Sequence, residues 1–294
     1  MRTAFIIGCN GYLGRNVSEY LLADNWKVYG FDVAVTCYRK DIPYQQIDVS
    51  KSDCWNAITL QDADLIFFFS GITGTWKGFD EWEHYLTVNE KGLLFFLQAM
   101  RQSNATGRII FPSTRLVYKG VQDTPLKEDA EKLPLTVYAV NKLSCENYLQ
   151  AYSHVFNINF TVFRVCVPYG SLIDGEHSYG TIGFFETKAR TGEAIVLYGD
   201  GSLKRTFTHV HDIARIMTNV SLKEESNKKT YNIGGDTFSL LGAASLVAEK
   251  FGVEIKFQQW PLEAEIIESG DTIFDSTAVE QLEPPHVKTL QGQY

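Results

Sequence analysis

Tyr138 and Lys142 stand four positions apart in the sequence and could form a proton-transfer site. The pattern around them predicts a helix from 137 to 156, and residues four apart share one face of a helix. The Lys142 ammonium would then lie near the Tyr138 phenol, lower its pKa toward neutrality and prepare it to exchange a proton with a carbinol. A surface helical pair has the same spacing, so other residues must support this interpretation.

A hydroxyl residue upstream of this pair supplies that support. The apolar run 108–111 predicts a strand that brings Pro112, Ser113 and Thr114 to the carboxyl edge of a sheet. The Thr114 hydroxyl could orient and polarise a substrate oxygen, or it could only cap the end of the strand. A hydroxyl, a phenol and an ammonium together suit proton transfer during oxidation or reduction of a carbinol.

A glycine-rich segment near the N-terminus predicts a nucleotide-binding turn. The apolar run 4–7 predicts a short buried strand, and a helical pattern continues to Ala23. Between them, glycines let the chain turn sharply and bring backbone N–H groups against a phosphate at the helix N-terminus. The residues expected to bind the cofactor here are Gly8, Asn10, Gly11, Tyr12, Leu13 and Gly14.

Asp32 ends the next apolar run, where an acid would hydrogen-bond the ribose hydroxyls of an adenosine. Its carboxylate would repel a 2′-phosphate, so NAD is favoured over NADP. Arg15 and Arg39 lie near enough in the sequence to soften that preference.

Two further strands should also end at the cofactor. Predicted strands 44–47 and 65–69 reach the sheet edge where a doubly wound fold places its ligand. The candidate residues at or just after their ends are Asp48, Val49, Ser70 and Gly71.

The order of elements predicts an α/β fold with a Rossmann-type doubly wound parallel sheet, because strands and helices alternate up to residue 170. Beyond it, glycines separate shorter elements. We therefore expect an NAD-binding domain over 1–170 and a smaller substrate-binding lobe over 171–294, discontinuous and with some segments free to return to the sheet. The other expected elements are helices 53–60, 82–103, 184–191, 240–251 and 213–222, strands 160–167, 195–197 and 230–233, and a cap on helix 213–222 by Asp212.

The spacing Gly8-x-x-Gly11-x-x-Gly14, taken with Thr114 and the tyrosine–lysine pair, resembles the extended short-chain dehydrogenase/reductase superfamily and its nucleotide-sugar epimerases and dehydratases. The resemblance continues in order through Asn89-Glu90-Lys91-Gly92, Arg164-x-x-x-Pro168-Tyr169-Gly170, Tyr198-Gly199-Asp200-Gly201-Ser202, His211-Asp212-Ile213-Ala214 and Tyr231-Asn232-Ile233-Gly234-Gly235. It implies an enzyme that uses NAD and acts on a nucleoside-diphosphate sugar.

The resemblance also implies roles for single residues. Tyr138 would shuttle the proton, Lys142 would bond the nicotinamide ribose, and Thr114 rather than Ser113 would be the catalytic hydroxyl. The remaining implied contacts are those of Asp48 with the adenine amino group, unless that carboxylate is merely solvated, and of Arg205 with the substrate's diphosphate.

Departures from the family pattern narrow the reaction. Family dehydratases carry Asp-Glu directly after the catalytic threonine, whereas this chain has Arg115 and Leu116, which cannot act as carboxylate acid and base. Arg115 becomes a candidate substrate contact. Val167 replaces a usual asparagine, and His177 is either a second acid/base for epimerisation or a solvated loop histidine.

Two reactions fit this machinery. If a ketone formed at sugar C4 is reduced again from its other face, the enzyme is a 4-epimerase; if it reduces an imported 4-keto sugar, it is a reductase. Epimerisation is preferred, because NAD suits a cycle that regenerates its own cofactor. A non-catalytic nucleotide-binding member of the fold is the remaining alternative.

Composition limits the partners. The net charge of -8 over 294 residues argues against nucleic-acid binding, and no apolar run is long enough to span a membrane. Five scattered cysteines without a Cys-x-x-Cys pair indicate reduced thiols and no structural zinc. We expect a cytoplasmic protein, and a homodimer formed through helices 82–103 and 137–156, because the first is apolar on more than one face.

Overall fold

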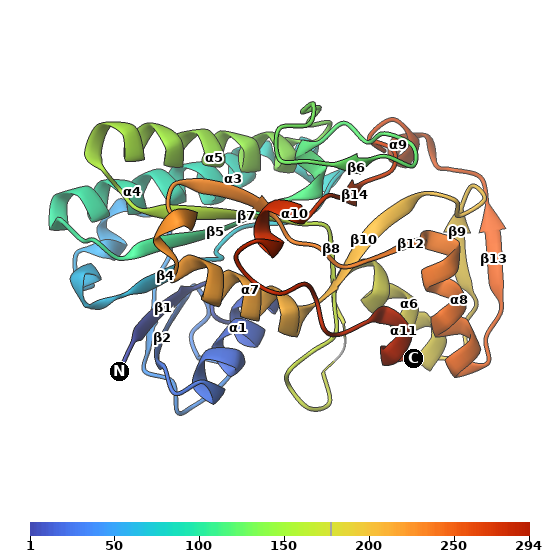
Figure 1. Cartoon of the computed structure of the whole chain (residues 1–294), viewed down its shortest axis with the longest axis horizontal. Helices are drawn as coiled ribbons and strands as arrows, with labels where there is room; N and C mark the ends of the chain where they lie inside the picture. Colours follow the sequence, from blue (N-terminus) through green and yellow to red (C-terminus); the bar gives the residue numbers. More distant parts are fainter. Residues whose placement is uncertain (177) are drawn as a thin grey trace.

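A parallel sheet of seven strands organises the computed structural model, which describes residues 1–176 and 178–294 (Figure 1). Within the described residues the strand order is β11-β7-β5-β4-β1-β2-β3, and every neighbouring pair is parallel. The strands are β1 (Thr3–Ile7), β2 (Lys27–Asp32), β3 (Tyr44–Gln46), β4 (Leu65–Phe68), β5 (Arg108–Thr114), β7 (Phe160–Val165) and β11 (Lys229–Asn232). The predicted Rossmann-type fold is confirmed.

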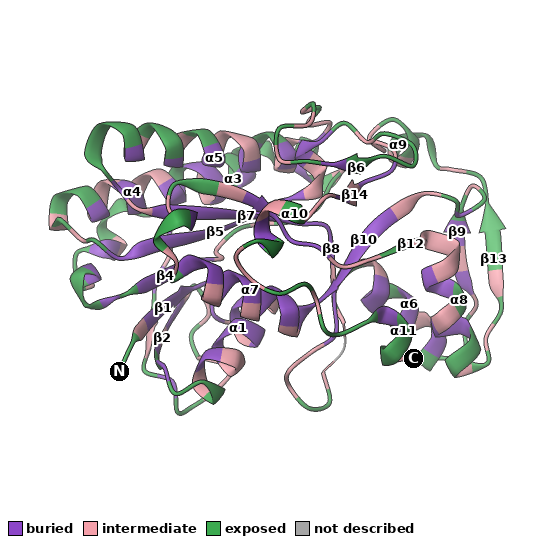
Figure 2. Cartoon of the chain, in the orientation of Figure 1, coloured by how far each residue is buried: buried purple, intermediate pink, exposed green. Residues whose placement is uncertain are grey.

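Helices cover both faces of this sheet, which explains why its strands are apolar runs (Figure 2). Successive residues of a strand point to opposite faces. Ile6 therefore packs with α1 (Tyr12–Ala23) and α7 (Val210–Ser221), while Phe5 packs on the other side with α4 (Gly92–Ser103) and α5 (Val137–Phe156). The order of the strands reverses at β1, so β1 and β4 diverge at a topological switch point.

The predicted helix 82–103 is continuous in the chain but changes its winding. It consists of α3 (Trp82–Tyr85), a π-helical segment (Leu86–Lys91) and α4, preceded by the short α2 (Lys77–Asp80). The extra residue in each π turn lets neighbouring Asn89 and Glu90 both be buried. Both side chains bond Asn141. Asn89 also bonds the backbone of Ile72, and Glu90 also accepts from the hydroxyl of Tyr148.

A second lobe with its own apolar core is built from segments on both sides of residue 170. Three segments after residue 170 instead join the main sheet and its core, namely α7, β11 and α10 (Thr277–Glu280). The lobe contains the three-stranded sheet β12-β10-β8, the pair β13-β9 and the pair β14-β6. Its strands are β6 (Pro125–Leu126), β8 (Val167–Tyr169), β9 (Ile195–Tyr198), β10 (Lys204–His209), β12 (Asp236–Ser239), β13 (Ile255–Gln258) and β14 (Ile273–Phe274). Its helices are α6 (Gly180–Arg190), α8 (Leu240–Phe251), α9 (Leu262–Glu265) and α11 (Leu290–Gln293). The division into 1–170 and 171–294 stays a prediction.

The predicted helix 53–60 is wrong. The segment forms two separate 3-10 turns, Ser52–Trp55 and Leu60–Asp62. Trp55 and Leu60 both pack into the core under α4. Residues five apart point in different directions on one α-helix, so two short turns bury both side chains where a single helix would bury one.

Two other expectations need correction. The predicted strand 160–167 divides at Cys166, because β8 leaves the main sheet and pairs with β10 in the second lobe. Asp212 does not cap helix α7; His209 does, and its Nδ1 accepts from the backbone N–H of His211. The buried Asp212 carboxylate instead accepts from the backbone N–H groups of Val287 and Lys288.

The helices α3 and α5 carry exposed apolar side chains, including Trp82 (53% exposed) and Val140 (45% exposed). The homodimer through these helices stays a prediction.

No helix among the described residues has the length and apolar character needed to cross a membrane. The cytoplasmic location also stays a prediction.

A buried ion pair holds α5 against the sheet. Arg164 of β7 donates from Nε and Nη2 to the two carboxylate oxygens of Glu146 on α5, and the two side chains are only 5% and 7% exposed. Ser113 Oγ donates to the same carboxylate. Because Ser113 directly precedes Thr114, and Glu146 lies one helical turn after Lys142, this pair sets the distance between the strand end and the helix that carry the predicted catalytic residues.

Replacing Arg164 with Met should lower the free energy of unfolding by about 3–5 kcal/mol, because it leaves a buried carboxylate without its cation. Urea denaturation monitored by circular dichroism measures the loss. The double variant Arg164→Met/Glu146→Leu should regain most of it, since no charge then stays buried. A loss below about 1 kcal/mol in the single variant would contradict this role for the pair.

Candidate active site

Two adjoining cavities form a cleft at the carboxyl edge of the main sheet, where β1 and β4 diverge. The Asp32 cavity, of about 460 Å³, is lined by Asp32, Asn10 and residues after β3 and β4. The Tyr138 cavity, of about 560 Å³, is lined by Tyr138, Lys142 and Thr114. The residues that line both are Gly8, Gly11, Phe69 and Gly71, so the two cavities are parts of one cleft.

Glycine is required at two positions of the turn between β1 and α1. Gly8 has a φ of +90°, and a Cβ there would lie 2.7 Å from the backbone nitrogen of Ser70. A Cβ on Gly14 would lie 2.1 Å from the Gly8 carbonyl oxygen. Gly11 precedes α1 and offers no side-chain cap, so the first-turn N–H groups of the helix remain available to an anion. The turn therefore fits a phosphate group.

Asp32 is held in the Asp32 cavity by the turn itself. Its Oδ2 accepts from the backbone N–H of Asn10 at 2.9 Å, and its Oδ1 accepts from that of Ala34 at 3.1 Å. A carboxylate has about four acceptor positions, so two remain for the two hydroxyls of a ribose. The other predicted residues that line this cavity are Asp48, Val49, Ser70 and Gly71.

The two arginines that could have favoured a 2′-phosphate already have partners. Arg15 pairs with Glu176, and Arg39 pairs with both Glu19 and Asp41. These ion pairs occupy the guanidinium groups of both arginines. The described residues that line the Asp32 cavity include two carboxylates, Asp32 and Asp48, and neither lysine nor arginine.

Thr114, Tyr138 and Lys142 converge on the Tyr138 cavity from two elements. Thr114 ends β5, and its Oγ1 accepts from the backbone N–H of Leu116 at 3.2 Å, so it caps the following turn as well as facing the cavity. Thr136 caps α5 by accepting from the backbone N–H of Ala139, which starts the helix just before Tyr138. The Thr114 hydroxyl proton remains available to a ligand oxygen.

The expected lowering of the Tyr138 pKa is not found. Burial raises the pKa of Tyr138, and nearby Tyr179 raises it further. Lys142 Nζ lies 5.9 Å from the centre of the Tyr138 ring and donates to the Pro112 carbonyl at 2.8 Å instead of to the phenol. Burial lowers the pKa of Lys142 itself to about 8. The walls of the cavity thus disfavour charge on both groups, which sequence spacing does not reveal.

The predicted substrate arginines do not line either cavity. Arg205 is 2% exposed, and its guanidinium donates to Glu268 at 2.6 Å and to the Gly270 carbonyl at 2.7 Å. Burial, and then the neighbouring Arg205, lowers the pKa of Arg115 to about 10. Their contacts with a substrate stay predictions. His177, the other predicted substrate contact, lies outside the described residues.

Sequence reasoning missed Tyr179, which lies at the Tyr138 cavity. Its ring stacks on that of Tyr12, with the centroids 5.3 Å apart, and its hydroxyl lies 2.8 Å from Thr73 Oγ1. Tyr179 thus joins the loop after β4 to the start of α6. No motif marks this residue, and its position depends on two segments that are more than a hundred residues apart.

Comparisons with known proteins agree with this arrangement. The model of the NAD dependent epimerase/dehydratase family matches residues 4–234. The putative UDP-glucose 4-epimerase of Methanocaldococcus jannaschii is 22% identical over 214 residues, covering 71% of this chain and 70% of the relative. The UDP-glucuronate 4-epimerase of Thermodesulfobacterium geofontis is 26% identical over 246 residues, covering 78% of this chain and 74% of the relative.

Two solved structures share the fold over almost the whole chain. The UDP-glucose 4-epimerase of Thermus thermophilus in complex with NAD has a TM-score of 0.86 at 21% identity, covering 99% of this chain and 96% of the other. The dTDP-glucose 4,6-dehydratase DesIV of Streptomyces venezuelae, also with NAD bound, has a TM-score of 0.85 at 20% identity, covering 100% and 94%. Epimerases and dehydratases thus share this architecture.

The Lys142 ammonium should titrate near pH 8, more than two units below an ordinary lysine, because burial disfavours its charged form. NMR of lysines labelled with ¹³C at Cε measures the titration. Lys132 should titrate in the same range, since burial lowers its pKa to about 8 as well. The variant Lys142→Met should remove one of these two signals; if both persist, Lys142 titrates elsewhere.

Proposed function

Because this chain belongs to the NAD dependent epimerase/dehydratase family, we propose that it is an NAD-dependent nucleotide-sugar epimerase that acts by transient oxidation at sugar C4. One observation carries the proposal. A single cleft holds Asp32 at one end and Thr114, Tyr138 and Lys142 at the other, with the glycine turn between them. A turn that fits a phosphate thus lies beside a hydroxyl, a phenol and an ammonium, which supports a nucleotide-dependent proton transfer.

The residues of the cleft fit NAD. The turn made by Gly8, Gly11 and Gly14 can take the diphosphate, and Asp32 can accept from both hydroxyls of the adenosine ribose. Asp48 lies in the same cavity, where it can reach the adenine. When bound, NAD supplies a hydride acceptor and donor. NAD is preferred over NADP, because the nearby arginines are already paired with carboxylates.

The chain's own residues would then move and hold the proton. Tyr138, as its phenolate, takes the proton of the sugar hydroxyl during oxidation and returns it during reduction. The positive charge of the nearby Lys142 ammonium would offset the burial that favours the neutral phenol. Thr114 donates a hydrogen bond to the same sugar oxygen and so fixes its position. Lys142, whose ammonium is already held by the Pro112 carbonyl, can bond ribose hydroxyls beside the phenol.

The chemistry of the Tyr138 cavity argues against dehydration. Removal of water from a sugar needs an acid and a base near C5 and C6, and the described residues that line this cavity include no aspartate or glutamate. Leu116 lines it at the place where the family's dehydratases carry a carboxylate, and Arg115 does not line it. The proposal therefore excludes a 4,6-dehydratase.

Substrate incubation tests the function directly. Relatives named as UDP-glucose and UDP-glucuronate 4-epimerases suggest that the panel start with those sugars and their C4 epimers. Interconversion seen by NMR without added NADH supports epimerisation. Consumption of NADH with a 4-keto sugar, and no interconversion of the panel, would contradict it in favour of the reductase.

Tyr138→Phe should lower the turnover rate by roughly 100-fold to 10,000-fold, because it removes the group that exchanges the proton but keeps the ring. Binding of NAD, followed by calorimetry, should change little. Thr114→Val should cost less, since it removes an orienting hydrogen bond and leaves the shuttle. Near-normal turnover in the Tyr138→Phe enzyme would mean that another group moves the proton.

Asp32→Ala should weaken NAD by about tenfold or more, because two hydrogen bonds to a charged acceptor are lost. Binding of NADP should weaken less or improve, since the repulsion of its 2′-phosphate disappears. Asp129→Ala, which removes an exposed carboxylate outside the cleft, controls for net charge. If the unmodified protein bound both cofactors equally, Asp32 would not set the preference.

A further inference from the structure

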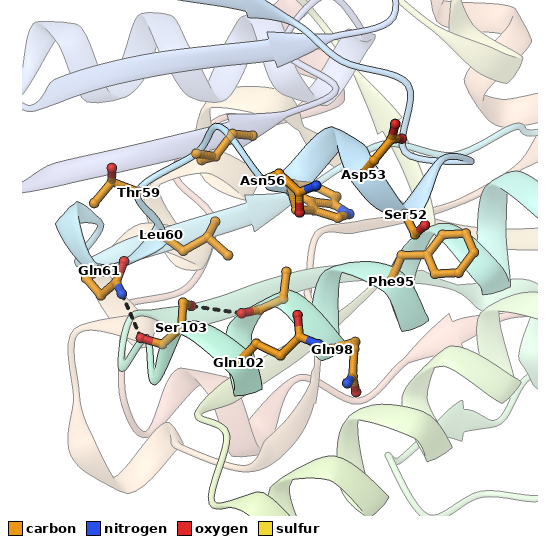
Figure 3. A pocket seen from close by; sticks show the side chains of 13 residues that line it. Ser52, Asp53, Asn56, Thr59, Leu60, Gln61, Phe95, Gln98, Gln102 and Ser103 are labelled. Atoms are coloured by element: carbon orange, nitrogen blue, oxygen red, sulfur yellow. Dashed lines mark hydrogen bonds between the residues drawn. The ribbon is translucent and has the colours of Figure 1, made fainter.

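A separate cavity of about 580 Å³ opens beside α4, away from the cleft (Figure 3). Two 3-10 turns, Ser52–Trp55 and Leu60–Asp62, form one side of it, and one face of α4 forms the other. Its lining residues are Ser52, Asp53, Trp55, Asn56, Ile58, Thr59, Leu60, Gln61, Phe95, Gln98, Ala99, Gln102 and Ser103. None of them lines the cleft, so a ligand bound here would not occupy the epimerase site.

Part of the wall of this α4 cavity is apolar and packed against the core. Trp55 is 4% exposed and Leu60 is 1% exposed. The Trp55 ring packs on Phe96 with the centroids 5.0 Å apart, and Phe96 itself stacks on Phe68 of the sheet. Phe95 and Ala99 continue the apolar surface along α4. Phe95 and Ala99, which are only half-buried, can take the C–H face of a ring.

The rim of the cavity consists of amides and hydroxyls. Within the described part of the chain, the side chains of Asn56, Gln98 and Gln102 make no hydrogen bond with the protein. Gln61 donates to the Ser103 carbonyl at 2.6 Å and so ties the second turn to the end of α4 (Figure 3). Three free amides therefore offer both donors and acceptors around one opening.

One buried donor in the wall has no acceptor. Trp55 Nε1 is enclosed and lacks a hydrogen-bond partner among the described residues. By contrast, the indole of Trp26 donates to Asp24. A buried N–H group without an acceptor is unfavourable, so a small shift of the wall that let a ligand oxygen reach it would gain a bond without breaking another.

We propose that the α4 cavity binds a neutral, polyhydroxylated ligand, a sugar or a glycoside. Vicinal hydroxyls both donate and accept, as do the free amides, and Asp53 adds a strong acceptor. The apolar part of the wall takes the face of the sugar ring. The Trp55 N–H group lacks an acceptor, which a sugar oxygen would supply. No Lys, Arg or His is among the lining residues described, so the site does not select a phosphate or a carboxylate.

The Trp55 indole signal tests this without any turnover, so the test is independent of the proposed epimerase activity. Protein labelled with ¹⁵N at tryptophan is titrated with methyl α-D-glucopyranoside and methyl β-D-galactopyranoside, and Trp55→Phe assigns the signal. A saturable shift with a dissociation constant on the order of millimolar is expected for such a small ligand. Saturating UDP, which would occupy the cleft, should leave that shift unchanged.

Paired variants locate the site. Gln98→Ala/Gln102→Ala should weaken the sugar by about tenfold or more, because two amides are removed. Gln150→Ala, an exposed glutamine on α5 outside the cavity, should bind as the unmodified protein does. The proposal would be overturned if the double variant bound the glycoside as tightly as the unmodified protein, or if no saturable shift appeared up to about 100 mM glycoside. It would also be overturned if the Trp55 signal shifted saturably with inorganic phosphate or spermidine and not with the glycosides.

Discussion

The buried pair between Arg164 and Glu146 is the contact on which the geometry of the cleft depends. It joins β7 to α5 and, through Ser113, to the end of β5. A charge pair in an apolar interior tolerates little displacement, because each ion would lose the opposite charge that offsets the cost of burying it. The strand that presents Thr114 and the helix that presents Lys142 are therefore held at one separation, and the proposed catalytic arrangement follows from a contact outside the cleft.

Burial also governs the electrostatics of the site. Desolvation raises the pKa of Tyr138 and lowers that of Lys142, so the protein interior favours the neutral form of each. The other end of the cleft differs, because the Asp32 carboxylate accepts hydrogen bonds from two backbone N–H groups. One cleft thus combines an end lined by carboxylates with a weakly polar end at Tyr138.

Local patterns in the sequence were sufficient for much of this architecture. Short apolar runs marked the strands buried on both faces, and helix 137–156 was placed with its observed ends. The glycine spacing indicated the turn after β1, because a Cβ on Gly8 or Gly14 cannot be accommodated there. These features depend on steric and hydrophobic rules that act over a few residues. The residues placed on that turn and on the ends of the strands accordingly meet in one cleft.

The sequence by itself thus determined the sheet, its glycine turn and the convergence of Thr114, Tyr138 and Lys142. Only the tertiary structure decided which charges remain free. Arg205 looked available for a ligand, yet a segment more than sixty residues later brings Glu268 to it. Tyr179 entered the cleft through contacts between segments far apart in the chain. Desolvation and long-range ion pairing depend on every element that packs around a group. The spacing of residues along the sequence does not show which distant segments those are.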